Sequence, residues 1–120
     1  MISIKRAYED PAPQDGYRVL VDRVWPRGRT KEDLALDEWA KALAPSAKLR
    51  KWFGHAPKRW HVFQQRYREE LSTLQQRERL KSLMTAAGNR RLTLVYGAKD
   101  EEHNQAVVLR DMLSQMPSHH

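Results

Sequence analysis

Charged side chains follow two short apolar segments of this chain and are its clearest candidates for chemistry. Asp22 and Arg23 come directly after an apolar run at residues 19–21. Lys99 follows a second apolar run at residues 92–96. A short, continuous apolar run is typical of a strand buried on both faces. If the two strands are parallel, their carboxyl ends meet at one edge of the sheet, where open α/β sheets bind ligands, and we expect a site there.

The residue types at this edge suit a small anionic ligand that is phosphate-like or nucleotide-like. Arg23, Arg27 and Lys99 would supply positive charge. A helix that begins near residue 103 would direct its first backbone N–H groups, and the positive end of its dipole, at the same space. In the structural alternative, Asp100 only caps that helix and Arg23 only pairs with an acidic neighbour.

Two titratable groups at this edge are candidates for moving a proton. An imidazole titrates near neutral pH, so His103 is one catalytic candidate, and Asp22 is the other. Trp25 either covers a planar ligand or packs under Pro26, and the sequence favours neither. Whether the chain is an enzyme stays open. The predicted contacts with the ligand are Arg23, Trp25, Arg27, Lys99, Asp100 and Asn104.

Several kinds of site are excluded by the composition and the motifs. The chain has no cysteine, which excludes disulfides, thiolate catalysis and cysteine metal sites and fits a reducing cytosol. No pair of histidines has metal-ligand spacing with a third ligand nearby, and no serine lies in a nucleophile elbow. A glycine-rich phosphate loop is absent as well. We therefore expect neither a metal ion nor a cofactor.

The positive charge of the chain is concentrated in its middle. Residues 48–91 hold 12 Lys and Arg against 3 Asp and Glu, a net charge of +9, whereas the rest of the chain carries −2. A second interpretation is therefore a nucleic-acid-binding module without sequence preference, since no DNA-reading motif is present. A third is an adaptor for an acidic protein partner, and a solvated helical surface is the simplest alternative. The nucleic-acid interpretation assigns phosphate contacts to Lys48, Arg50, Lys51, Lys58, Arg59, Arg66 and Arg68.

A small α/β domain would position these residues. Three or more strands in an at least partly parallel sheet are predicted near residues 2–6, 17–22 and 91–96. The connection between the last two is long enough for a right-handed crossover. About five helices cover the sheet. The spacing of apolar residues predicts them at residues 36–43, 47–53, 57–72, 76–87 and 103–114. Residues 30–33 are polar and are expected to be mobile.

One of these helices carries a long apolar stripe. Its residues are spaced at i, i+3, i+7, i+11 and i+14, which places them on one face of a single helix. The stripe consists of Trp60, Phe63, Tyr67, Leu71 and Leu74. We expect this face to form part of the core.

Several segments carry a recognisable family pattern. The signature is Arg-Val-Leu-Val-Asp-Arg-Val-Trp-Pro-Arg-Gly at residues 18–28. The pattern continues at residues 43–46, 49–53, 63–67, 70–71, 93–96 and 98–100, and at Asn104, Ala106, Val107 and Leu109. These segments resemble the YeaO-like family of bacterial proteins, a branch of domain-of-unknown-function family 488. The resemblance spans residues 2–114 and implies a small cytoplasmic α/β domain with no established activity.

This chain differs from other branches of the wider family in its late region. Those branches have a Val-Asp-Val-Arg type of strand end and a late Cys-His-Arg. Here residues 103–105 are His-Asn-Gln and cysteine is absent. The resemblance therefore implies neither sulfur transfer nor cysteine-phosphatase chemistry.

The chain is predicted to be one domain over residues 1–120. Its length is close to the commonest size of a single domain, and residues 117–120, which end in His119 and His120, are predicted to be a disordered tail. The first six residues lack the apolar run of a signal peptide, and no segment approaches the roughly 20 apolar residues of a membrane span. We therefore expect a cytoplasmic protein without membrane contact.

Overall fold

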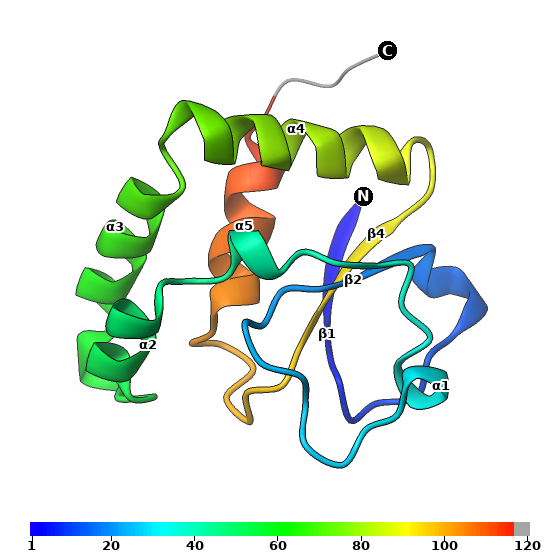
Figure 1. Ribbon diagram of the computed structural model, residues 1–120, viewed down its shortest axis with the longest axis horizontal. Coiled ribbons are helices and arrows are strands. Elements are labelled where there is room, and N and C mark those ends of the chain that lie inside the picture. The colour runs from blue at the N-terminus through cyan, green and yellow to red at the C-terminus, as the bar shows by residue number, and fades with distance from the viewer. Residues whose placement is uncertain (117–120) are drawn as a thin grey trace.

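The computed structural model describes residues 1–116, which form one parallel sheet with helices packed around it (Figure 1). The strands are β1 (Ile2–Arg6), β2 (Tyr17–Leu20), β3 (Glu38–Trp39) and β4 (Leu92–Tyr96). The helices are α1 (Lys31–Leu34), α2 (Ala47–Phe53), α3 (Trp60–Glu70), α4 (Leu74–Ala87) and α5 (Gln105–Ser114). The strand order is β1-β4-β2-β3, so the expected α/β class is confirmed. The expected tail with His119 and His120 lies outside the described residues.

The two apolar strands lie side by side at the centre of the sheet. β2 and β4 pair in parallel, with Val19 opposite Leu94 and Leu20 opposite Val95. All five residues of β4 are buried, as a central strand with both faces covered requires. The expected parallel pairing is therefore confirmed, and the chain leaves both strands at the same edge of the sheet.

The predicted helix over residues 36–43 is wrong. Glu38 and Trp39 instead form β3, which pairs in parallel with β2, and Lys41–Leu43 form a short 3-10 turn. The backbone N–H of Ala40 donates to the carbonyl of Leu20 at 2.9 Å, and that of Asp37 donates to Arg18. The open edge of β2 thus offers hydrogen-bond partners to the backbone of residues 37–40. These bonds stabilise a strand more than the four apolar residues of this segment stabilise a helix.

Residues 30–33, which the sequence marks only as a polar segment that is expected to be mobile, form the start of α1 in the structure. Thr30 Oγ1 accepts the backbone N–H of Asp33 at 3.0 Å, and Asp33 Oδ2 accepts that of Thr30 at 2.9 Å. This reciprocal capping box satisfies two N–H groups that a helix start leaves without intrahelical partners. Leu34 then anchors the short helix on the sheet, where it is fully buried.

The predicted helix over residues 57–72 is divided differently in the structure. Residues Pro57–Arg59 form a 3-10 turn before α3, and α3 ends at Glu70. Phe63, Tyr67 and Leu71 are buried as expected. Leu74, the last residue of the predicted stripe, is 77% exposed because Thr73 caps a new helix and changes the direction of the chain.

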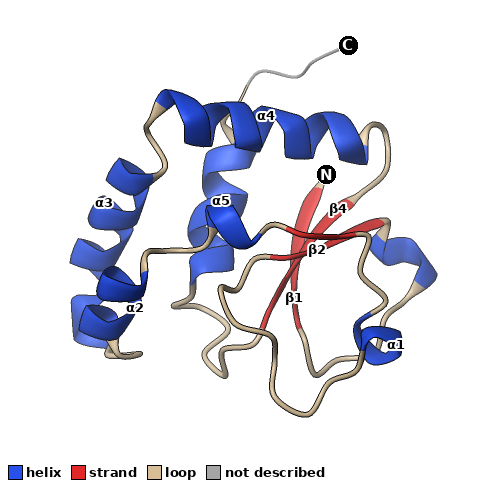
Figure 2. Cartoon of the chain, viewed as in Figure 1, coloured by secondary structure: helices blue, strands red, loops and turns tan. Residues whose placement is uncertain are grey.

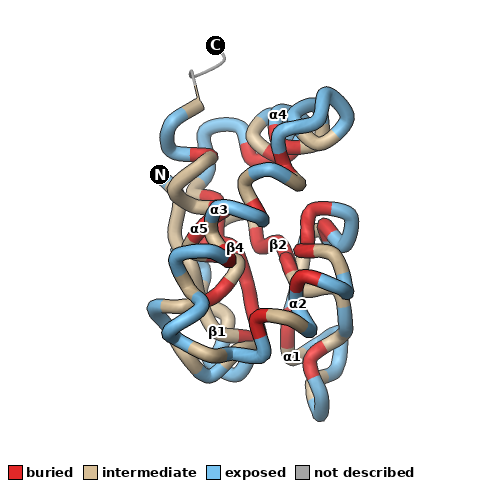
Figure 3. Tube along the Cα trace, turned by 90° about the vertical axis from the view of Figure 1, so that its left-hand side faces the viewer, coloured by how far each residue is buried: buried red, intermediate tan, exposed pale blue. Residues whose placement is uncertain are grey.

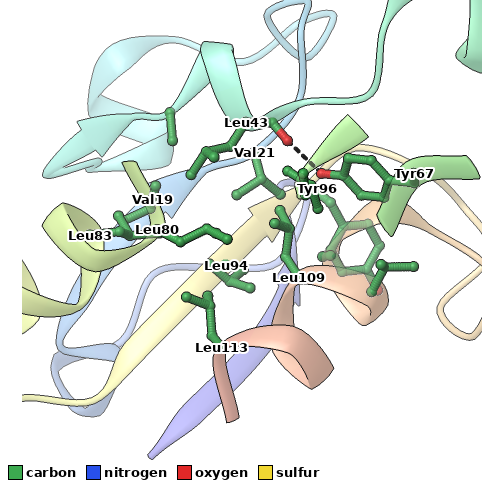
Figure 4. Close-up of a cluster of buried hydrophobic side chains, with 14 of the residues drawn as sticks. Val19, Val21, Leu43, Tyr67, Leu80, Leu83, Leu94, Tyr96, Leu109 and Leu113 are labelled. Carbon is green, nitrogen blue, oxygen red and sulfur yellow. Dashed lines mark hydrogen bonds between the residues drawn. The ribbon is translucent and has the colours of Figure 1, made fainter. Parts of the chain in front are cut away.

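The main core lies between one face of the sheet and helices α3, α4 and α5. In Figure 3 the buried part of the trace follows β2 and β4. Figure 4 shows Val19 and Val21 of the first apolar segment with Leu94 of the second, packed against Leu80 of α4 and Leu109 of α5. Tyr67 enters the same core and donates its hydroxyl hydrogen to the carbonyl of Leu43, as the dashed line in Figure 4 marks.

A smaller apolar cluster covers the opposite face of the sheet. Leu20 and Val95 point there because side chains alternate along a strand, and Leu34 of α1 packs on them. In Figure 2, α2 and α3 lie together on one side of the strands and α1 lies on the other. No helix within residues 1–116 is long and apolar enough to cross a membrane.

Candidate functional site

A cavity of about 250 Å³ opens at the carboxyl edge of the sheet. Asp22, Arg23 and Trp25 reach it from the segment that follows β2. Gly97 and His103 reach it from the segment that joins β4 to α5. The parallel pairing of β2 and β4 brings these two segments together, so the cavity lies where the apolar strands predict a site.

The structure brings five of the eight predicted site residues to this cavity and leaves three outside its lining. The five that line the cavity are Asp22, Arg23, Trp25, Arg27 and His103. Lys99 is exposed and does not contribute to the lining. Asp100 and Asn104 lie behind the lining and bond to the backbone of their own segment.

Asn104, and not Asp100, is the N-cap of α5. Its Oδ1 accepts the backbone N–H of Val107 at 3.2 Å, and its Nδ2 donates to the carbonyl of Asp100 at 2.8 Å. Asp100 Oδ1 accepts the N–H groups of Glu102 and His103, at 2.9 and 3.0 Å. The expectation that these two amides are free to bind an anion is therefore wrong, because a side chain already occupies them.

The carboxylate of Asp22 is held by two groups from the other side of the cavity. Its Oδ2 accepts the backbone N–H of Gly97 at 2.9 Å, and its Oδ1 accepts a hydrogen bond from the side-chain amide of Gln105. A Cβ at position 97 would lie 2.9 Å from Asp22 Oδ2, so a larger residue there would push the Asp22 carboxylate away from the backbone N–H that it accepts. Trp39 Nε1 donates to the backbone carbonyl of Asp22 at 2.6 Å and fixes the segment from the other side.

Asp22 titrates close to neutrality. Burial raises the pKa of this carboxyl from 3.8 to about 6, because it disfavours the charged form more than the surrounding groups favour it. The Gly97 N–H, the charge of Arg50 and the Gln105 amide all act to lower the pKa. A carboxylate kept in a cleft against a desolvation cost is more common at functional sites than elsewhere.

Arg23 is oriented by the backbone and not by an acid. Its Nε donates to the carbonyl of Pro45 at 3.1 Å. Within residues 1–116 it forms no salt bridge, so the alternative in which Arg23 pairs with an acidic neighbour is wrong. The two terminal nitrogens of its guanidinium group are thus left for a ligand in the cavity.

The imidazole of His103 is held in place on two sides. Its Nδ1 lies 2.9 Å from Asp100 Oδ2, and its ring packs edge-on against Trp60 with the ring centroids 5.3 Å apart. The backbone N–H of Glu102 and the contact with His103 hold the pKa of Asp100 below its ordinary value. Since Nδ1 faces Asp100, Nε2 is the nitrogen that His103 can offer to a ligand.

The cavity also contains residues that sequence reasoning did not place there. Arg50 and His55 come from α2 and the turn after it. Tyr8 comes from the loop after β1, and Gln105 from the first turn of α5. Nothing in the local pattern of these residues marks them as site residues, because only the packing of α2 beside the strand ends brings Arg50 near Asp22.

Trp25 is fixed by its own loop while it lines the cavity. Its Nε1 donates to the carbonyl of Arg29 at 2.6 Å, and its ring meets Trp39 edge-on at 5.5 Å between centroids. Tyr8 donates its hydroxyl hydrogen to the carbonyl of Arg27 at 2.9 Å. These bonds hold the loop after β2 in one conformation, so the aromatic part of the cavity wall is preorganised.

The residues assigned to nucleic-acid contacts lie along α2 and α3. Lys48, Arg50 and Lys51 are exposed on α2, and Arg66 is exposed on α3. Of the seven, Arg50 alone lines the cavity. Within residues 1–116 no three His, Asp or Glu side chains gather closely enough to hold a metal ion.

Comparison with known proteins identifies the family. A family model described as the inactive DUF488-N3 subclade matches residues 1–119. The uncharacterized protein YeaO of Escherichia coli (strain K12) is 46% identical over 112 residues, which cover 93% of this chain and 96% of that protein. The uncharacterized protein Rv3073c of Mycobacterium tuberculosis (strain ATCC 25618 / H37Rv) is 39% identical over 113 residues, or 94% of this chain and 93% of that protein. Comparison with the solved structures gives no significant match. The YeaO-like resemblance of the sequence is thus confirmed, and the chain belongs to the DUF488 family, in its inactive N3 subclade.

Proposed function

We propose that this protein binds a small anionic, nucleotide-like ligand in the cavity at the carboxyl edge of the sheet. The observation that carries the proposal is the charge of the lining. Three guanidinium groups, from Arg23, Arg27 and Arg50, line a cavity that contains one carboxylate, that of Asp22. Guanidinium groups bind phosphate oxygens in pairs, and they do so most strongly where the site is partly shielded from water.

The rest of the lining favours a nucleotide over a simple phosphate ion. The wall includes the aromatic rings of Tyr8, Trp25, Phe53 and Phe63. Ligand cavities typically combine an apolar or aromatic wall with a few polar groups that fix the orientation of the ligand. A nucleotide matches both parts, since its phosphate suits the guanidinium groups and its base suits the aromatic wall.

Binding without turnover is the form of this function that we favour. The family model that the chain matches is described as inactive. In that role Asp22 contributes its charge to the cavity and His103 contributes a ring nitrogen for hydrogen bonding, and neither transfers a proton. The catalytic alternative keeps both as acid and base, and it predicts that an incubated mononucleotide is converted to a product that chromatography separates from it.

Arg23→Ala is expected to weaken the binding of a mononucleotide ten- to a hundredfold. The substitution removes charge-assisted hydrogen bonds worth about 1.5–3 kcal/mol. The stability of the fold should change much less, because Arg23 donates only one hydrogen bond within the described residues, to Pro45. Isothermal titration calorimetry with the four ribonucleoside 5′-monophosphates and inorganic phosphate measures the effect.

Arg77→Ala is the matched control for this prediction. Arg77 is exposed on α4 and does not line the cavity, so its removal should leave the affinity unchanged. If none of the five compounds binds the wild-type protein at millimolar concentration, the cavity is not a nucleotide site. Equal losses of affinity in both variants would show that net charge, and not the cavity, determines binding.

A further inference from the structure

The strongest signal outside the cavity is the basic surface that adjoins it. We propose that this surface, formed by Lys48, Lys51, Arg59 and Arg66 on and beside α2 and α3, binds the phosphodiester backbone of a single-stranded nucleic acid. One nucleotide of the strand then occupies the cavity. The inference rests on the proposed function, and it names the kind of molecule to which the bound nucleotide belongs.

Helical geometry makes α2 a ridge between the cavity and α3. Successive residues of a helix are separated by about 100°, and the buried residues Leu49 and Phe53 define the inner face of α2. Lys51 therefore points outward, opposite the core. Arg50 lies on one flank, where it lines the cavity. Lys48 lies on the other flank, on the side of Trp52, whose ring packs against Arg66 of α3. Positive charge thus continues from the cavity across the helix without a break.

Two arginines at the α3 side of this ridge are held in fixed positions. Arg59 Nη1 donates to the carbonyl of Trp52 at 2.6 Å, and its Cζ lies 5.4 Å from the centroid of the Trp52 ring. Arg66 Cζ lies 4.5 Å from the same centroid. An arginine that rests on an aromatic ring loses little further freedom on binding, and its N–H groups remain available for phosphate oxygens.

The basic surface has no acidic partners of its own. Within residues 1–116, none of the 12 Lys and Arg of residues 48–91 forms a salt bridge. Glu70, one of three acids in that range, accepts hydrogen bonds from the backbone N–H and hydroxyl of Ser46. Solvated surfaces that only maintain solubility usually intersperse charges of both signs. An unneutralised row of cations fits the regular charges of a nucleic-acid backbone.

The dimensions favour a single strand over a duplex. α2 has seven residues and is about 10 Å long, too short to serve as a recognition helix along a groove. A base can enter a cavity of about 250 Å³ only when it is unpaired and unstacked. The carboxylates of an acidic protein could pair with the basic side chains of the ridge, but the aromatic wall of the cavity would then have no partner.

The test compares a strand with its monomer on the same protein. Lys48→Glu/Lys51→Glu changes two exposed side chains for which no hydrogen bond occurs within residues 1–116. Fluorescence anisotropy with a labelled ten-residue oligothymidylate gives the affinity at several salt concentrations, and calorimetry with thymidine 5′-monophosphate gives the affinity of the cavity. Arg77→Glu/Lys81→Glu, on α4, carries the same change of charge away from the ridge. Poly-glutamate serves as the protein-like polyanion.

We expect the oligonucleotide to bind more tightly than the monophosphate, with a log–log salt slope of about −0.7 for each phosphate contacted. The ridge variant should lose at least tenfold in oligonucleotide affinity, should show a slope smaller by about 1.4, and should bind the monophosphate as the wild type does. The α4 variant should change oligonucleotide affinity less than about threefold, since screening limits its reach.

Other results separate the two proposals. Three outcomes would overturn the proposal that the basic surface binds nucleic acid while leaving the cavity function intact. The oligonucleotide could bind no more tightly than the monophosphate, the Lys48→Glu/Lys51→Glu variant could bind it as the wild type does, or poly-glutamate could bind with equal affinity. Strong oligonucleotide binding that Arg23→Ala does not change, without any binding of the monophosphate, overturns the cavity function and leaves the surface.

Discussion

Phe63→Ala is expected to lower the free energy of unfolding by about 3–5 kcal/mol, the usual cost of truncating a large aromatic side chain in a core. Phe63 is 2% exposed and stacks on Phe53 with the ring centroids 4.3 Å apart. The rings of Trp60 and Tyr67 each lie 5.7 Å away on the same measure. Removing the central ring of this aromatic cluster leaves a void that its neighbours cannot close without leaving their own positions. Urea denaturation followed by tryptophan fluorescence measures the change.

Val62→Ala is the control on the same helix. Val62 precedes Phe63 in α3 but is 37% exposed, so its truncation should cost less than about 1 kcal/mol. A loss below about 1 kcal/mol for Phe63→Ala would show that this face of α3 is not packed as described. Trp60 belongs to the same sequence stripe but is only partly buried, so its truncation should cost less than that of Phe63.

Asp22→Asn is expected to raise the free energy of unfolding by up to about 3 kcal/mol at pH 7.5. The pKa of Asp22 is about 6 in the folded protein, above the value of 3.8 for an unperturbed carboxyl. A raised pKa means that the folded state binds the proton more tightly than the unfolded state does. Stability in the wild type is therefore lost as the pH rises from about 4 to about 6, and the loss is complete above that range. Asparagine cannot ionise and avoids this cost.

The pH dependence distinguishes this effect from a simple change in packing. The difference between Asp22→Asn and the wild type should be full above pH 6 and should vanish as the pH falls towards 4, as denaturation at a series of pH values would measure. Asp33→Asn provides the opposite case, because hydrogen bonds from Thr30 hold the pKa of Asp33 below its ordinary value. That variant should lose stability at neutral pH. A pH-independent effect of Asp22→Asn would contradict the titration assigned to this carboxyl.

A carboxylate that destabilises the fold at neutral pH calls for a functional explanation. Natural proteins retain such groups where activity requires them, at a cost in stability. In the proposed binding site, the charge of Asp22 opposes an anionic ligand and its neutralisation favours one. Mononucleotide binding to the wild type should therefore tighten as the pH falls from 7.5 to 5, because the Asp22 carboxylate becomes neutral over that range.

The central part of the fold could be predicted because its determinants are local. The runs at residues 19–21 and 92–96 are apolar on both alternating faces, and only a central strand buries both. Ser46 caps α2 by accepting the N–H of Leu49 at 3.1 Å, and Gly54 ends that helix with a left-handed backbone at φ 53°. Each of these features depends on residues within one turn or one strand, which sequence patterns describe directly.

The segment at residues 36–43 depended on a distant partner, whereas the cap of α5 depended on a choice between two nearby residues. β3 forms because β2 has an open edge to which it can pair. The paired residues, such as Val19 and Glu38, are nearly twenty positions apart in the sequence. At the start of α5, Asp100 and Asn104 are both good capping residues, and only Asp100 was considered as the cap from the sequence. The path of the chain after β4 puts Asn104 at the N-cap and directs Asp100 to the imidazole of His103.

The amino-acid sequence by itself determined that two buried strands end in charge and that positive charge accumulates between them. Alternation along a strand and spacing along a helix can be read directly from the order of residues in the chain. Those conclusions therefore did not depend on the tertiary structure. The tertiary structure alone decided which charges meet. Arg50 reaches the cavity of Asp22 because α2 packs beside the strand ends, whereas Lys99, only three residues after the end of β4, remains outside the lining. Contacts between residues far apart in the chain are set by how whole elements pack, and packing is a property of the complete core.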